Sequence, residues 1–107
     1  METNDAVTRL SALAQGSRLE VFRLLVRRAP TPMAAGEIAE AMDLANATLS
    51  FQLKELTQAG LLTSKQEGRR VLYAPSFDAM RELVAYLMEN CCAESDAATD
   101  EKLCDVG

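Results

Sequence analysis

The stretch MAAGEIAEAMDLANATLSFQLKELTQAGLL, residues 33–62, contains two helical patterns separated by a short turn. The first pattern predicts a helix over residues 35–42, and the second predicts one over residues 46–58 that ends before Gly60. The apolar residues of the second helix fall on a single stripe: Leu49, Leu53 and Leu56. Two short helices joined by a tight turn are typical of a helix-turn-helix, whose second helix enters the major groove of DNA.

Two more helices are predicted upstream of this unit. Residues 3–14 have helical spacing, and a break follows them. Ser17 is the predicted N-cap of the next helix, because Glu20 follows three residues later in the pattern of a capping box. This helix extends to about Arg28, where two prolines stop it. Its predicted inward side chains are Leu19, Phe22, Leu25 and Val26.

Downstream, the sequence changes from helical to strand-like periodicity. Two short strands are predicted near 61–65 and 70–74, with Glu67-Gly68 turning between them. A last helix is predicted from about Phe77 to Cys91. The fold class is therefore mostly α, a winged helix-turn-helix of order α-α-α-α-β-β-α, in which the hairpin is the wing.

The charge of the chain is concentrated at its end. The protein has 107 residues and a net charge of −5. Residues 1–92 carry ten basic and eleven acidic side chains, whereas residues 93–107 carry one Lys and five acids. We therefore predict one DNA-binding and dimerisation domain over 1–92 and a flexible acidic tail over 93–107. A nucleic-acid binder that relies on net charge alone is disfavoured.

The side of the second motif helix opposite its leucine stripe predicts DNA contacts. It carries small and hydroxyl side chains, an exposed aromatic ring and a cation: Ala47, Thr48, Ser50, Phe51 and Lys54. Gln52 is a weaker candidate at the edge of this side. Arg69 and Arg70, at the hairpin tip, are suited to a phosphate row or the minor groove. The alternatives are that Phe51 is a core residue and that the two arginines belong to a solvated turn.

The order of elements and two segments resemble the ArsR/SmtB repressors. LAQGSRLEVFRLLVR, residues 13–27, is similar to the Leu-x-x-x-x-Arg-x-x-Ile-Leu segment that opens these repressors. Residues 36–76 are similar to their helix-turn-helix and wing, and the match covers roughly residues 5–90. The resemblance implies a homodimeric repressor that a metal or metalloid releases from operator DNA. It also implies a dimer built from the first and last helices, through Val7, Leu10, Leu83, Val84 and Leu87.

The sequence departs from the family's usual effector sites. The chain contains no His, so the usual zinc site of Asp and His on the last helix cannot form. Many arsenic-sensing relatives carry a cysteine pair at positions that correspond to Ala34 and Gly36, and neither residue binds a metal. The missing His also changes the recognition helix, where Ser50 to Leu56 replace a Ser-His-His-Leu-like stretch.

All three cysteines lie in the last 17 residues: Cys91, Cys92 and Cys104. Three thiolates are soft ligands that suit trivalent arsenic or antimony, and this pattern resembles an arsenic-responsive subgroup of the family with C-terminal cysteines. The predicted effector is therefore As(III), with Sb(III) as a second. Still open are Cd, Pb or Hg, organoarsenicals, a thiol redox sensor without metal, and incidental surface thiols.

Two other classes of protein are disfavoured. An enzyme is not expected, because the chain has no Cys-x-x-Cys, no phosphate-cradling loop and no His base. A membrane protein is not expected either, because no stretch approaches the ~20 apolar residues that span a bilayer. The polar N-terminus lacks the apolar region of a signal peptide, so we expect a cytoplasmic location.

Overall fold

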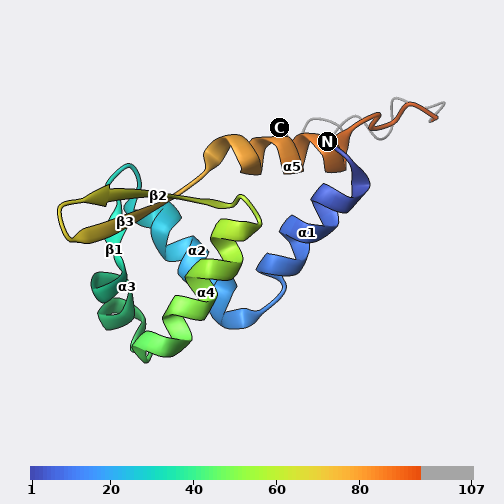
Figure 1. Cartoon of the computed structure of the whole chain (residues 1–107). Helices are drawn as coiled ribbons and strands as arrows, with labels where there is room; N and C mark the ends of the chain where they lie inside the picture. Colours follow the sequence, from blue (N-terminus) through green and yellow to red (C-terminus); the bar gives the residue numbers. More distant parts are fainter. Residues whose placement is uncertain (95–107) are drawn as a thin grey trace.

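The computed structural model describes residues 1–94, which form five helices and a three-stranded antiparallel sheet (Figure 1). In chain order the elements are α1 Thr3–Leu13, α2 Gly16–Arg28, β1 Met33–Ala34, α3 Ala35–Met42, α4 Asn46–Gln58, β2 Leu62–Glu67, β3 Arg70–Pro75 and α5 Phe77–Met88. The predicted winged helix-turn-helix is confirmed: α3 and α4 form the motif, and the β2–β3 hairpin is the wing. No helix of the described residues is long and apolar enough to cross a membrane.

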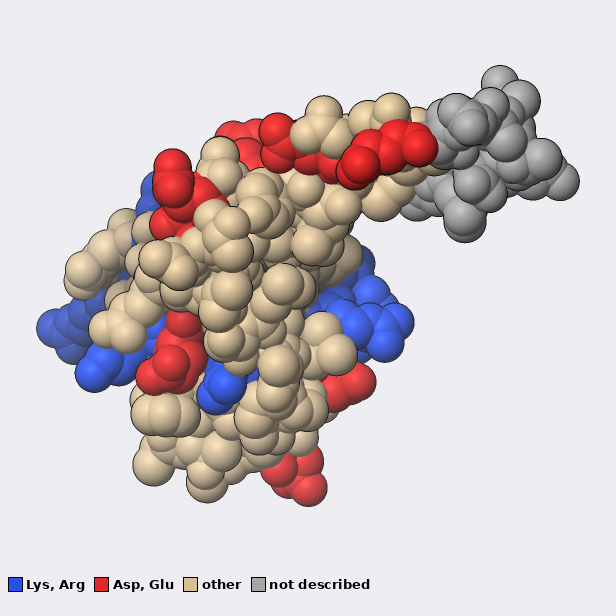
Figure 2. All heavy atoms as spheres, turned by 90° about the vertical axis from the view of Figure 1, so that its right-hand side faces the viewer, with Lys and Arg blue, Asp and Glu red and all other residues tan. Residues whose placement is uncertain are grey.

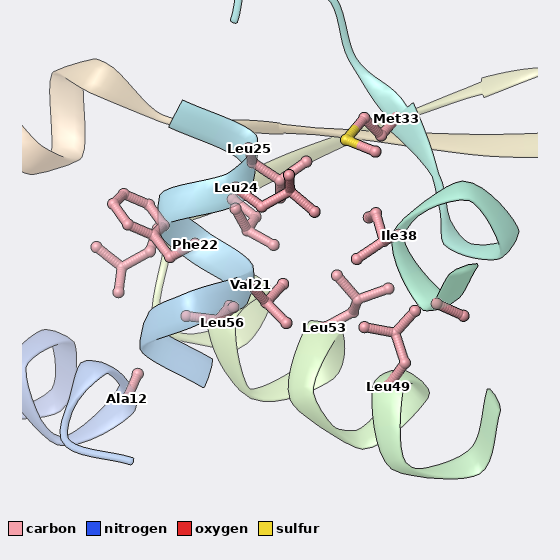
Figure 3. Close-up of a cluster of buried hydrophobic side chains, with 13 residues drawn as sticks. Ala12, Val21, Phe22, Leu24, Leu25, Met33, Ile38, Leu49, Leu53 and Leu56 are labelled. Carbon is pink, nitrogen blue, oxygen red and sulfur yellow. The ribbon is translucent and has the colours of Figure 1, made fainter. Parts of the chain in front are cut away.

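The core lies where α2, α3 and α4 meet beneath the sheet. Figure 3 shows side chains of these three helices pointing toward one another, with Met33 of β1 closing one side. The side chains with the least exposure are Val21, Leu25, Ile38, Leu49, Leu56 and Leu61. The predicted leucine stripe of α4 is therefore its buried side.

Two backbone turns fix how α4 is placed. Asp43, between α3 and α4, is left-handed with φ 54°, and Leu44 N–H reaches back to the Ala39 carbonyl at 3.0 Å. At the other end Gly60 has φ 82°, and Leu61 N–H donates to the Leu56 carbonyl at 3.0 Å, which is a Schellman motif. Together they set the angle between the motif helices and the direction in which the wing leaves α4.

Strand β1 and the hairpin turn differ from the prediction. Strand β1 was not predicted, because two residues give no measurable periodicity; it pairs with β3 through Met33 and Tyr73. The predicted turn at Glu67-Gly68 is wrong by one residue. Glu67 pairs with Arg70, so Gly68 and Arg69 form the turn, and Gly68 supplies the required positive φ of 65°.

Three predictions about the helices are also wrong. Gln15, not Ser17, caps α2, because its side-chain oxygen accepts from Arg18 N–H at 2.8 Å. Leu19 and Val26 are exposed, since the core-facing stripe of α2 runs through Val21, Leu24 and Leu25 instead. Helix α5 ends at Met88 rather than at Cys91, because Asn90 adopts the left-handed conformation with φ 59°.

Neighbouring positions on α4 should differ sharply in their effect on stability. Leu53 is 2% exposed and Phe51 is 56% exposed. We expect Leu53→Ala to lower the free energy of unfolding by about 2–5 kcal/mol, because it opens a cavity in the core. Phe51→Ala should change it by no more than about 0.5 kcal/mol. Denaturant unfolding followed by circular dichroism measures both, and a large loss for Phe51→Ala would contradict the observed orientation of α4.

Candidate nucleic-acid interface and cysteine pair

One side of α4 is free of the core. Because the leucine stripe holds the helix from behind, the opposite residues are all exposed: Ala47, Thr48, Ser50, Phe51 and Lys54. The predicted exposure of this group is confirmed, and the alternative that Phe51 belongs to the core is excluded. This surface presents small and hydroxyl side chains around one ring and one cation. Its chemistry suits close approach to a DNA groove.

Gln52 does not belong to the exposed side of α4. Its side chain is 6% exposed, and its Oε1 accepts a hydrogen bond from Arg18 Nη1 at 3.4 Å. Arg18 Nε also donates to the Ala12 carbonyl at 2.7 Å. Gln52 therefore links α4 to the junction of α1 and α2. The sequence analysis did not single out Arg18, although it is the Arg of the Leu-x-x-x-x-Arg segment.

The two wing arginines have different surroundings. Arg70 Nη2 lies 2.7 Å from Glu37 Oε1 at the start of α3, and the same oxygen accepts from Ala34 N–H at 2.9 Å. Arg69 lies in the exposed turn at the tip of the hairpin. The two residues were predicted to act alike, but Arg70 is paired with a residue of the helix-turn-helix, whereas Arg69 lies in the exposed turn of the wing. The Arg70–Glu37 pair is exposed, so its energetic contribution is small.

Acidic side chains line one edge of the surface. Figure 2 shows them along the top of the molecule, whereas Lys, Arg and further acidic side chains lie together lower down. Two exposed acids lie on α5, Asp78 and Glu82, and Glu89 follows the helix. Arg81 pairs with Asp78 and Arg9 with Glu82, so neighbouring cations offset the charge of both α5 carboxylates.

Helices α1 and α5 pack together and leave an apolar surface. Arg9 Nη1 donates to the Ala79 carbonyl at 2.8 Å, and the Thr3 and Tyr86 hydroxyl groups are 2.6 Å apart. Four of the five predicted interface residues are exposed on these helices: Val7, Leu10, Val84 and Leu87. The fifth predicted interface residue, Leu83, is 2% exposed. Leu83 therefore belongs to the contact within the chain rather than to a surface that a second chain could cover.

The two described cysteines lie just beyond α5. The Cys91 and Cys92 sulfurs are 3.3 Å apart; Cys91 is an exposed free thiol, and Cys92 is disulfide-bonded. Cys92 has φ 63°, a conformation that is strained for a residue with a Cβ. Within residues 1–94, no group of three or more His, Cys, Asp or Glu side chains could hold a metal ion. The predicted third ligand, Cys104, lies outside the described residues.

Comparisons with known proteins agree with this geometry. Residues 13–65 match a family model described as a helix-turn-helix domain. The nodulation protein NolR of Rhizobium meliloti is 28% identical over 94 residues, which are 88% of this chain and 75% of NolR. A protein of Halobacterium salinarum named "Putative arsenical resistance operon repressor ArsR" is 32% identical over 76 residues, 71% of this chain. The chain spans 58% of that protein's length.

Solved structures give the same result. HlyU from Vibrio cholerae is 32% identical, with a TM-score of 0.64 over 81% of this chain and 97% of HlyU. The protein Mb0332 of Mycobacterium bovis is 26% identical, with a TM-score of 0.66 over 88% of this chain and 87% of that one. Its structure is described as a homodimeric winged helix-turn-helix DNA-binding domain of "a possible ArsR-family transcriptional regulator". The chain belongs to the ArsR family of winged helix-turn-helix transcriptional regulators.

Proposed function

We propose that this protein is a homodimeric repressor that binds operator DNA through α4 and the wing and leaves it when trivalent arsenic, or antimony, binds the C-terminal cysteines. The observation that carries the DNA-binding part is the exposed side of α4. A helix that buries three leucines and presents Ser50, Phe51 and Lys54 outward is placed to enter a major groove. The apolar Phe51 ring can contact the methyl group of thymine.

The dimer rests on the apolar residues of α1 and α5. Val7, Leu10, Val84 and Leu87 are between 41% and 56% exposed, which is unfavourable for large apolar side chains in water. A two-fold axis beside these helices would bury all four twice and place two copies of α4 at a fixed separation. Such a separation lets both recognition helices reach successive major grooves on one side of DNA.

A charge on the apolar surface should separate the dimer. We expect Leu87→Glu to sediment as a monomer at a concentration where the wild type is a dimer, because the buried pair of carboxylates would repel each other and lack partners. Val71→Glu is the matched control, since Val71 is exposed on the wing and away from α1 and α5. A wild type that sediments as a monomer would contradict the dimer and the repression mechanism that depends on it.

The wing arginines should contribute to the salt dependence of DNA binding. Replacing Arg69 and Arg70 with Ala should weaken binding and reduce the slope of log K against log salt by up to about two, because each phosphate contact releases roughly one counterion. Arg69→Ala alone should reduce this slope by about one. Arg70→Ala should have a smaller effect, because Arg70 is paired with Glu37 of α3. Fluorescence anisotropy at several salt concentrations measures the slope.

Arg81→Ala is the control for this experiment. Arg81 pairs with Asp78 on α5, outside both the wing and α4, so its loss should leave the slope unchanged. A slope that is the same in wild type and in the Arg69 and Arg70 variants would exclude the wing as a DNA contact.

The effector proposal rests on the cysteine chemistry. The chain contains no His, and its thiols are confined to the end of the sequence. Because bonds from thiolate sulfur to a metal are about 2.3 Å long, two sulfurs 3.3 Å apart can bind the same ion once Cys92 is reduced. Soft thiolates favour thiophilic ions, and a relative named as a repressor of an arsenical resistance operon supports arsenic among them.

The position of the cysteines suggests how binding of a metalloid would alter DNA binding. Cys91 follows Met88, the last residue of α5, by three positions, and α5 also carries Val84 and Leu87. An ion that draws the cysteines together would reorganise the end of the dimer helix and so change the distance between the two copies of α4. A coupling of about 1–3 kcal/mol is enough for such regulation.

A second candidate is thiol redox sensing by the same cysteines. The adjacent cysteines beyond α5, with sulfurs 3.3 Å apart, favour it, because oxidation of a thiol to a disulfide needs no metal. Oxidation would replace As(III) as the event that alters the end of α5. Organoarsenicals and Cd, Pb or Hg ions would act on the same thiolates and require the reduced protein.

Arsenite should release the reduced protein from DNA only when the cysteines are intact. Cys91→Ser should bind operator as tightly as wild type but stay bound in arsenite, because serine is a hard ligand and the pair is lost. Cys104→Ser tests the third ligand: X-ray absorption should show three sulfurs around arsenic in wild type and two in this variant. Release by Cd, Pb, Hg or an organoarsenical but not by arsenite would exclude As(III) as the effector, and release by an oxidant alone would favour redox sensing.

A further inference from the structure

A polar pocket lies between the exposed side of α4 and the base of the wing. It has a volume of about 300 Å³. Its polar lining residues are Ser50, Lys54, Thr57, Gln58, Ser64 and Tyr73. The first four come from successive turns of α4, and the last two are direct partners across β2 and β3. The pocket therefore joins the recognition helix to the wing, two elements that were assigned separate DNA contacts above.

The chemistry of the lining favours an anion that accepts hydrogen bonds. Four hydroxyl groups, one amide and the Lys54 ammonium face the pocket, and none of the residues that line it is acidic. Thr57 Oγ1 is buried and has no hydrogen-bond partner among the described residues. Because this oxygen has almost no accessible surface, a ligand does not reach it, and the accessible hydroxyl groups of the pocket are those of Ser50, Ser64 and Tyr73. A cation would meet Lys54, and an apolar ligand would leave the hydroxyl groups unsatisfied.

The location favours phosphate of the DNA backbone over other anions. Ser50 and Lys54 belong both to the pocket and to the exposed side of α4 that we propose enters the major groove. With α4 in the groove, we expect a DNA strand that borders the groove to pass between α4 and the wing. Tyr73 is partly buried against the core, so its hydroxyl group is held in place and costs little side-chain entropy on binding.

We propose that this pocket binds one backbone phosphate in each half of the operator, with Tyr73 and Ser64 as donors beside Lys54. The inference depends on the proposed DNA binding and adds residues of the wing base to it. A phosphate held from two elements at once sets the depth and angle of α4 in the groove without reading sequence. Lys54 supplies the charge, and the hydroxyl groups supply direction.

The test uses the intact dimer and a duplex that the protein itself selects from a random pool. Tyr73→Phe and Ser64→Ala should each weaken binding about threefold to tenfold, which corresponds to one hydrogen bond. The loss should be equal for the selected duplex and for unrelated DNA, because a phosphate contact carries no sequence information. The salt slope should stay unchanged in both variants and fall by about one in Lys54→Met, since only the cation displaces a counterion.

Neutral methylphosphonate groups, introduced one at a time, locate the phosphate. With wild type, one position in each half-site should weaken binding, and in the Tyr73→Phe, Ser64→Ala double variant that position should lose its extra sensitivity. Thr63→Val is the matched control, because Thr63 neighbours Ser64 on β2 but its side chain points to the other face of the sheet. Thermal unfolding should show that all variants fold.

The outcomes separate the two proposals. If wild type binds DNA but the hydroxyl variants bind normal and methylphosphonate duplexes with wild-type affinity, the phosphate pocket is wrong and the proposed function stands. The same holds if Thr63→Val weakens binding as much as Ser64→Ala. If wild type selects no duplex at all, the proposed function fails, and the pocket assignment fails with it.

Discussion

The contact between α2 and the leucine stripe of α4 is the constraint on which the rest of the structure depends. Leu25 of α2 and Leu56 of α4 are both fully buried, and Leu61 continues this contact into the wing. Burial of this side fixes the rotation of α4 about its own axis and thereby decides which residues face outward. A rotation by one residue, about 100°, would bury Phe51 and expose leucine. The exposed side is thus a consequence of core packing.

Hydrogen bonds and an ion pair add to the core packing that positions the motif helices. Arg18 and Gln52 connect the middle of α4 to the end of α1, and Glu37 connects the first motif helix to the wing through Arg70. The first link is partly buried, where a broken hydrogen bond is costly, whereas the second is exposed and weak. The recognition helix therefore has a firm connection toward α1, the helix that carries half of the apolar surface, and a softer one toward the wing.

The sequence was sufficient for the five helices, the hairpin and most of the exposed side of α4, because their apolar spacing specifies the period and, in α4, one buried stripe. It was insufficient wherever the answer depended on residues distant in the chain. Gln52 is buried because Arg18, 34 residues earlier, provides a partner for its amide. Arg69 and Arg70 are adjacent and identical, and only the position of Glu37 makes them different. The predicted burial of Leu19 and Val26 was wrong for another reason. Helix α2 has apolar residues on two faces, and periodicity does not indicate which face packs against the core.

The end of α5 at Met88 has an evolutionary consequence. Among the described residues, the buried apolar side chains all lie before Met88, while both described cysteines follow it. Mutations that insert, delete or respace residues after Met88 leave the helix register and the packed interior intact. Ligand spacing can therefore drift under selection without the loss of stability that a site inside the helices would impose. A lineage with this architecture can exchange one chemical stimulus for another while it keeps its DNA target.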